Sequence, residues 1–172
     1  DAVLVSGMLG DHGVAILSQR EGLAFAADVV SDSAALHTLA AQLIAACPSL
    51  RLMRDPTRGG LATTLNEIAV QSGVGIRLDE AALPVRPVVR AACEFLGLDP
   101  LYCANEGKLT AICAAADAPA LLAALRAHPL GQDAAIIGEV IADPRCFVRA
   151  RTPFGGERLV DWLNGEMLPR IC

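Results

Sequence analysis

Residues 51–79 read RLMRDPTRGGLATTLNEIAVQSGVGIRLD. The segment opens inside a short predicted strand (50–54), and Gly59-Gly60 then forms a turn into a helix that runs to Gly73. The last six residues alternate in polarity, as a strand with one buried face does. A strand, a helix and a second strand in succession indicate an α/β fold. The inward face of the predicted helix consists of Leu61, Leu65, Ile68 and Ser72.

Strands and helices continue on both sides of this segment. Further strands are predicted at 2–6, 108–115, 134–142, 146–152 and 157–160, and further helices at 14–20, 34–47, 88–98 and 118–127. The two kinds of element are mixed without strict alternation. We therefore expect an α/β sandwich, with one mixed sheet and helices packed on a face.

The length and composition fit one globular domain. A chain of 172 residues with 53% apolar residues can bury a sizeable core. The sequence begins with Asp1 rather than Met, and strand-like residues follow at once, so we expect it to be cut from a longer protein at a domain boundary. We expect residues 1–161 to form the domain and residues 162–172 to form a mobile tail, because the tail has little pattern of its own.

Charge and hydropathy argue against two classes of partner. The chain has 14 Lys and Arg residues against 19 Asp and Glu, and its net charge of −5 offers no attraction to nucleic acid or to an anionic membrane. No charge-free apolar stretch approaches the roughly 18 residues that a membrane span requires, and the N-terminus has no signal-peptide pattern. We expect a cytoplasmic protein that binds neither nucleic acid nor membranes.

The cysteines and histidines do not form a metal-site pattern. There is no C-x-x-C pair, and the three histidines are isolated, so a structural zinc site is not expected. Cysteines inside apolar runs are expected to be small core residues. Cys172 differs because it ends the sequence, where the neighbouring α-carboxylate disfavours its thiolate. The six cysteines are Cys47, Cys93, Cys103, Cys113, Cys146 and Cys172.

The loop Asp55-Pro56-Thr57-Arg58-Gly59-Gly60 is a candidate anion site. Free N–H groups at a helix N-terminus and the helix dipole favour an anion. Arg58 adds a bidentate hydrogen-bond donor suited to phosphate or carboxylate. The alternative is that the glycines only permit a tight turn, Thr57 or Asp55 caps the helix, and Arg58 pairs with a surface acid. No G-K-[ST] follows, so this is not a Walker A loop.

Three other short motifs could carry chemistry. The spacing of Gly7, Gly10 and Gly13 does not match a dinucleotide fingerprint. In Gly10-Asp11-His12-Gly13, Asp11 either caps the next helix or touches a ligand beside His12. Glu67 points away from the apolar stripe of its predicted helix, so it is either solvated or directed into a site. Asn105-Glu106-Gly107 precedes a buried strand, where a carboxylate can be held at the edge of a cleft, although a plain turn would also explain it.

These motifs, together with Pro169-Arg170-Ile171-Cys172 at the end of the sequence, resemble the HypE family of hydrogenase maturation factors. That family lies in the superfamily of aminoimidazole ribonucleotide synthetase and selenophosphate synthetase. The resemblance spans the whole chain and implies that it corresponds to the C-terminal α/β sandwich domain of such proteins. It also implies an N-terminal domain, absent from this sequence, that holds most of the site for ATP and Mg²⁺ and forms a homodimer.

The family's activity implies a reaction at Cys172. The carbamoyltransferase HypF places a carbamoyl group on the sulfur, ATP phosphorylates the carbamoyl oxygen, and loss of phosphate and of the nitrogen protons yields a thiocyanate. The cyanide then passes to iron on a HypC–HypD complex. Glu106 is expected to be the general base, with Glu67 and His12 as the next candidates. The 172 residues alone are expected to be inactive.

The resemblance also implies which residues contact the nucleotide. Arg58 and the N–H groups of Gly59 and Gly60 are expected to stabilise the departing phosphate. The other residues expected to contribute to ATP binding are Asp55, Thr57, Gly10 and Asp11.

Two other functions remain open at this point. The chain could belong to another ATP-dependent synthetase of the superfamily, which would need no terminal cysteine. It could also be a non-catalytic carrier domain that presents Cys172 to other proteins. Dependence of ATP hydrolysis on a carbamoylated Cys172 separates the first function from both alternatives.

Overall fold

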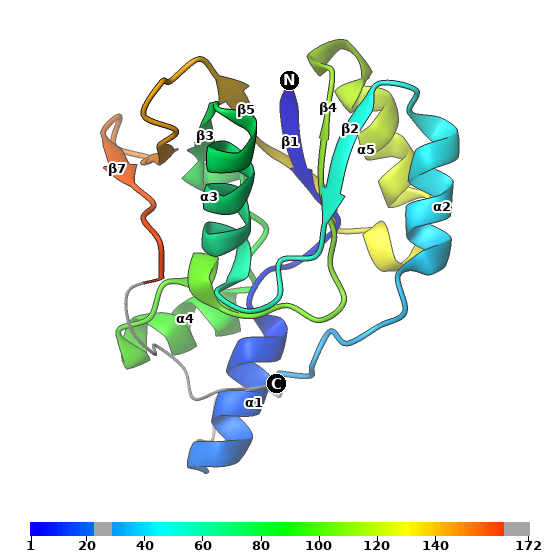
Figure 1. Ribbon diagram of the computed structural model, residues 1–172. Helices are drawn as coiled ribbons and strands as arrows, with labels where there is room; N and C mark the ends of the chain where they lie inside the picture. Colours follow the sequence, from blue (N-terminus) through cyan, green and yellow to red (C-terminus); the bar gives the residue numbers. More distant parts are fainter. Residues whose placement is uncertain (23–28, 164–172) are drawn as a thin grey trace.

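A seven-stranded mixed sheet forms the centre of the computed structural model, which describes residues 1–22 and 29–163 (Figure 1). The strands lie in the order β2-β4-β1-β5-β3-β6-β7, and neighbours are antiparallel except for the parallel pair β3 and β6. The predicted mixed sheet is therefore confirmed. Its strands are β1 (Ala2–Val5), β2 (Leu50–Arg54), β3 (Gly75–Asp79), β4 (Thr110–Cys113), β5 (Ala135–Ile141), β6 (Val148–Arg151) and β7 (Glu157–Leu159).

Five α-helices accompany the sheet in the described ranges, and each was predicted, with shifted ends. The helix predicted to begin at about residue 34 begins at His37, and the backbone N–H of Ala34 before it donates to the carbonyl of Glu106 (3.4 Å). The helices are α1 (Asp11–Glu21), α2 (His37–Ala46), α3 (Gly60–Ser72), α4 (Pro87–Leu96) and α5 (Ala118–Arg126). Short 3-10 turns lie at η1 (Glu80–Ala82), η2 (Pro100–Tyr102), η3 (Ala115–Asp117) and η4 (Pro129–Gly131).

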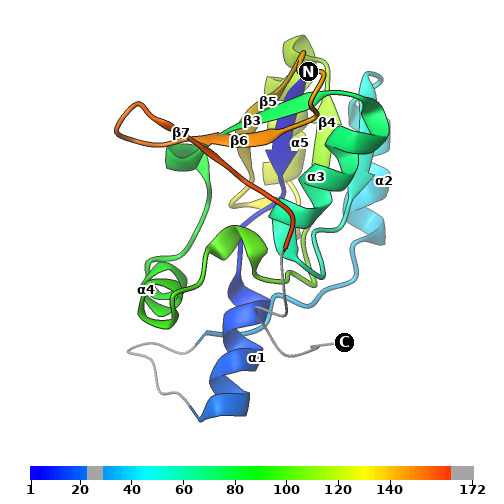
Figure 2. The same cartoon turned by 60° about the vertical axis from the view of Figure 1, so that its left-hand side comes forward.

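Helices cover both faces of the sheet, whereas the sequence predicted helices on a face (Figure 2). β1 explains the difference, because all four of its residues are buried. Val3 and Val5 belong to the core beneath α3, while Ala2 and Leu4 belong to the core beneath α2 and α5. Beyond β5 the second face carries exposed ion pairs instead, such as Arg77 with Glu139 (2.6 Å).

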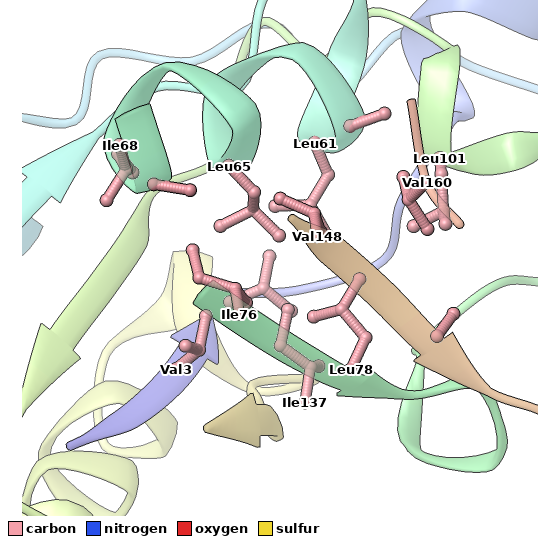
Figure 3. Packing of buried hydrophobic residues seen from close by; sticks show 14 of the residues in the cluster. Val3, Leu61, Leu65, Ile68, Ile76, Leu78, Leu101, Ile137, Val148 and Val160 are labelled. Carbon is pink, nitrogen blue, oxygen red and sulfur yellow. The ribbon is translucent and has the colours of Figure 1, made fainter. Parts of the chain in front are cut away.

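The core under α3 fixes the position of that helix against the sheet. Leu61, Leu65 and Ile68 point from α3 toward Ile76, Leu78 and Val148 on β3 and β6 (Figure 3). Each of these six side chains is at most 2% exposed, and burying one such side chain contributes about 1.5–3 kcal/mol. The predicted apolar face of the helix is therefore confirmed for its three large members, and the packing sets where the N-terminus of α3 lies.

Candidate active site

Asn105 joins the three polar segments that the sequence singled out. The backbone N–H of Gly10 donates to its Oδ1 (2.9 Å), and its Nδ2 donates to the carbonyls of Pro56 (3.0 Å) and Cys103 (3.1 Å). Asn105 is 1% exposed, so these bonds are shielded from water. The Gly10 turn, the Pro56 loop and the Glu106 loop therefore meet at one point of the fold.

The two glycines before α3 are required by the backbone. Gly59 and Gly60 have φ values of 73° and 62°, in the left-handed region that glycine tolerates. A Cβ on Gly60 would collide with the carbonyl of Leu101 and would lie 2.6 Å from that of Cys103. The predicted tight turn is thus confirmed, and it is closed by the Gly60 N–H, which donates to the carbonyl of Thr57 (2.9 Å).

The N-terminus of α3 has no side-chain cap. The suggestion that Thr57 or Asp55 caps it is wrong, because the N-cap position is Gly59 and no side chain hydrogen-bonds there. The first N–H groups of a helix have no partner within the helix. At α3 the N–H of Gly60 donates to the carbonyl of Thr57, and those of Gly59, Leu61 and Ala62 remain available to an anion.

A pocket of about 380 Å³ lies beside this helix start. Arg58, on its wall, is exposed and has no hydrogen bond or ion pair with any residue in ranges 1–22 and 29–163. Glu67 also lines the pocket, so it is directed toward the candidate site, but its carboxylate is bound by Arg54 (2.6 Å). The lining residues are Arg54, Asp55, Thr57, Arg58, Gly59, Thr63, Thr64, Glu67, Trp162 and Leu163.

Asp11 has a different role from the predicted cap. Gly10 occupies the N-cap of α1 with φ of 84°, and Asp11 lies in the first turn, 5% exposed. Its Oδ2 accepts a hydrogen bond from Nε of Arg86 (3.0 Å), a partner far away in the sequence. The next residue, His12, has its Nδ1 2.8 Å from Oγ of Ser31.

Glu106 is held through its backbone while its carboxylate stays free. Its N–H donates to Oδ1 of Asp32 (3.0 Å), and the other oxygen of Asp32 forms an ion pair with Lys108 (2.9 Å). The half-buried carboxylate of Glu106 has no bonded partner in the described part of the chain. Sequence reasoning missed Asp32, because Ser31-Asp32-Ser33 before a helix is typical of an ordinary helix start.

Four of the described cysteines are small core residues, as predicted. Burial, with Cys47 close by, raises the pKa of the Cys113 thiol to about 11, and the hydrogen bond to Cys93 together with burial raises the pKa of Cys103. Cys146 is half-buried. Cys47, Cys93, Cys103 and Cys113 are each at most 3% exposed.

Alkylation of the native protein near neutral pH is therefore expected to spare these four cysteines. Burial keeps the reagent away from all four thiols. A thiol reacts as its thiolate, and the raised pKa values of Cys103 and Cys113 also keep that form scarce, whereas the hydrogen bond with Cys103 lowers the pKa of Cys93, which burial alone protects. Iodoacetamide labelling followed by peptide mass spectrometry should show slow labelling of the half-buried Cys146 and essentially no labelling of the four core cysteines. Rapid labelling of Cys113 in folded protein would contradict this packing.

The described ranges contain neither a metal-binding cluster nor a membrane-spanning helix. No group of three or more His, Cys, Asp or Glu side chains in residues 1–22 and 29–163 is arranged to hold a metal ion. Within the same ranges, no helix has the length and apolar character needed to cross a membrane. Cys172 and most of the predicted tail lie outside the described residues.

The fold and the junction define a domain class. Residues 1–151 match the model for the AIR synthase related protein, C-terminal domain, and the chain belongs to this family. Over all 172 residues the chain is 70% identical to the carbamoyl dehydratase HypE of Cupriavidus necator, covering 49% of that protein. The chain thus spans about half the length of the relatives it matches.

Two solved structures show the same architecture. A crystal structure of the hydrogenase maturation protein HypE in complex with ATP has a TM-score of 0.93 and 52% identity, with 99% of this chain and 52% of that chain covered. The crystal structure of a HypE–HypF complex has a TM-score of 0.90 and 43% identity, with 94% and 52% covered. The α/β sandwich predicted from the sequence is therefore confirmed.

Proposed function

We propose that the protein to which this domain belongs is an ATP-dependent carbamoyl dehydratase that acts in [NiFe]-hydrogenase maturation. The observation that carries the proposal is the junction at Asn105, which unites an uncapped helix start beside the free Arg58 with the loop of the free Glu106 carboxylate. An anion site and an unpaired carboxylate are what phosphorylation followed by proton removal requires. The name of the Cupriavidus relative supports the same reaction.

The proposed reaction converts a thiocarbamate on Cys172 into a thiocyanate. Written out, R–S–C(=O)–NH₂ and ATP give R–S–C≡N, ADP, phosphate and one proton. The carbamoyl oxygen attacks the γ-phosphorus and displaces ADP, and the C–O bond then breaks as phosphate leaves. Both protons on the nitrogen must depart, so the site needs a proton acceptor close to the docked sulfur.

The phosphate contacts are assigned to the pocket at the start of α3. Arg58 and the N–H group of Gly59 bind the transferred phosphate, with Asp55 and Thr57 on the same wall. The N–H of Gly60, which the sequence also suggested as a donor, is already bonded to the carbonyl of Thr57. Gly10 and Asp11 contribute from the neighbouring turn, which Asn105 holds against the Pro56 loop. The N-terminal half of the longer protein supplies most of the ATP site, together with the groups that hold Mg²⁺.

Among the three candidate bases the geometry favours Glu106. The carboxylate of Glu67 is already bound by Arg54 at 2.6 Å. Nδ1 of His12 is bonded to Ser31, which leaves at most Nε2 of its ring to accept a proton, so His12 is the second choice. The carboxylate of Glu106 has no such partner in the described part of the chain. A general base must be free to accept a proton, so Glu106 takes this role.

The tail is proposed to start from a fixed point at the pocket. Nδ2 of Asn66 donates to the carbonyl of Val160 (2.9 Å), and the hydroxyl of Tyr102 donates to that of Asp161 (2.8 Å). Trp162 and Leu163 then line the pocket. An extended chain spans at most about 3.6 Å per residue, so the sulfur of Cys172 can travel roughly 40 Å from Asp161. We propose residues 162–172 as a mobile tail that uses this reach.

The proposed partners follow from the reaction. HypF supplies the carbamoyl group, and the relative solved in complex with HypF supports this choice. A HypC–HypD complex accepts the cyanide, and the N-terminal half forms the homodimer. We propose the cytoplasm as the location.

ATP hydrolysis by the full-length protein tests the proposed function. Phosphate release is expected only after Cys172 has been carbamoylated, and not in the Cys172→Ala variant. Hydrolysis at the same rate with and without a carbamoyl group on Cys172 would favour another synthetase of the superfamily. Carbamoylation without any hydrolysis would favour a carrier domain.

A further inference from the structure

The segment before α2 carries two adjacent polar side chains, and each is bonded to a proposed proton-transfer residue. Oγ of Ser31 lies 2.8 Å from Nδ1 of His12. Oδ1 of Asp32 accepts the backbone N–H of Glu106 at 3.0 Å. One short segment thus links the start of α1 to the loop before β4.

Asp32 is itself fixed by a buried ion pair. Its side chain is 4% exposed, and its Oδ2 lies 2.9 Å from Nζ of Lys108, which is 11% exposed. Two buried charges hold each other in place, because separating them would leave one charge without a partner or water. The oxygen that receives the Glu106 N–H therefore has a fixed position.

The backbone around Glu106 is held on its other side as well. The N–H of Ala34 donates to the carbonyl of Glu106 (3.4 Å), so the residue is bonded through both of its backbone groups. Gly107 lies so close to the carbonyl of Asp32 that a Cβ there would collide with it. These contacts leave Glu106 little freedom except in its own side chain.

We propose that Asp32 is a positioning residue, which fixes the backbone from which the Glu106 carboxylate reaches the S-carbamoyl group. The inference rests on the proposed function, in which Glu106 accepts a proton from the carbamoyl nitrogen. Asp32 does not touch the substrate. It acts through the backbone of Glu106, because the hydrogen bond and the ion pair fix where that side chain begins.

A double-mutant cycle in the full-length protein tests this inference. Asp32→Ala is expected to lower kcat for ATP-dependent dehydration about 10- to 100-fold while KM for ATP stays unchanged, since small misplacements of a catalytic group cost this much. In the Glu106→Gln background the same change should cause no further loss. Asp32→Asn, which keeps an oxygen for the Glu106 N–H, should recover part of the rate.

Asp143 offers a matched control for the cost of losing a buried ion pair. It is 7% exposed, accepts the N–H of Arg145 (3.0 Å) and pairs with Arg149 (2.8 Å), and it lies beside Gly75 at the other end of α3. Asp143→Ala should lower the melting temperature comparably to Asp32→Ala but leave kcat within about twofold, as it has no contact with the site.

The results of the cycle distinguish the positioning role of Asp32 from the proposed dehydratase function. Full activity of Asp32→Ala, or an equal further loss in the Glu106→Gln background, would overturn the positioning role and leave the dehydratase proposal standing. Full activity of Glu106→Gln would instead overturn the base assignment, and the role of Asp32 with it. If Asp32→Ala folds too poorly to assay, the cycle with Asp32→Asn decides by the same comparison.

Discussion

Glu106→Gln in the full-length protein is expected to slow dehydration of carbamoylated Cys172 by about 100- to 10,000-fold, the range over which a positioned general base contributes. Glutamine keeps the size of the side chain and the backbone bond to Asp32, but its amide cannot accept the proton. Carbamoylation by the partner enzyme should continue. Single-turnover conversion of the carbamoylated terminal peptide, followed by mass spectrometry, measures the rate.

Three comparison variants sharpen this experiment. Glu139→Gln removes a carboxylate that pairs with Arg77 on the exposed sheet face, so its rate should match the wild type. Glu67→Gln and His12→Asn test the two other candidate bases. If Glu106→Gln dehydrates at the normal rate while Glu67→Gln or His12→Asn is strongly slowed, the slowed variant identifies the general base.

Gly60→Ala is expected to destabilise the domain by about 3 kcal/mol. A left-handed backbone costs a residue with a Cβ roughly 1–2 kcal/mol, and overpacking typically adds about 1–3 kcal/mol. The added methyl would meet backbone carbonyls of η2 rather than flexible side-chain ends, so the neighbours cannot move aside easily. The midpoint of urea unfolding, measured by circular dichroism on the full-length protein, reports the change.

Gly73→Ala is the matched control for this prediction. Gly73 ends α3 with φ of 66°, close to the 62° of Gly60, but a Cβ there would meet nothing within 4 Å. Its substitution should therefore cost only the backbone term, about 1 kcal/mol. Equal losses for the two variants would show that the approach of η2 to Gly60 does not constrain the site.

Local patterns were sufficient to predict the order of elements and the glycine turn before α3. The helix period of Leu61, Leu65 and Ile68 depends only on neighbouring residues, and so does the turn at Gly59-Gly60. The two-sided sheet was harder to foresee. In a fully buried strand such as β1, apolar and polar residues do not alternate. Its sequence therefore does not show whether helices cover one face of the sheet or both.

Contacts between distant residues account for what the sequence could not predict in the candidate site. Asp11 resembles a helix cap, but its partner is Arg86, 75 positions away. Asp32 and Glu106 are 74 positions apart, and the sequence around either residue does not predict the hydrogen bond between them. Asn105 itself was visible only as part of a turn, although its side chain holds three loops together.

The measurement that tests the central claim most directly is peptide mapping by mass spectrometry. The full-length protein would be incubated with its carbamoyltransferase, carbamoyl phosphate and ATP, with Cys172→Ala as the control. We expect a carbamoyl group on the peptide that contains Cys172, converted with loss of one water only when ATP is present, and no modification in the control. An unmodified Cys172, or the same modification on another cysteine, would contradict the proposed dehydratase reaction.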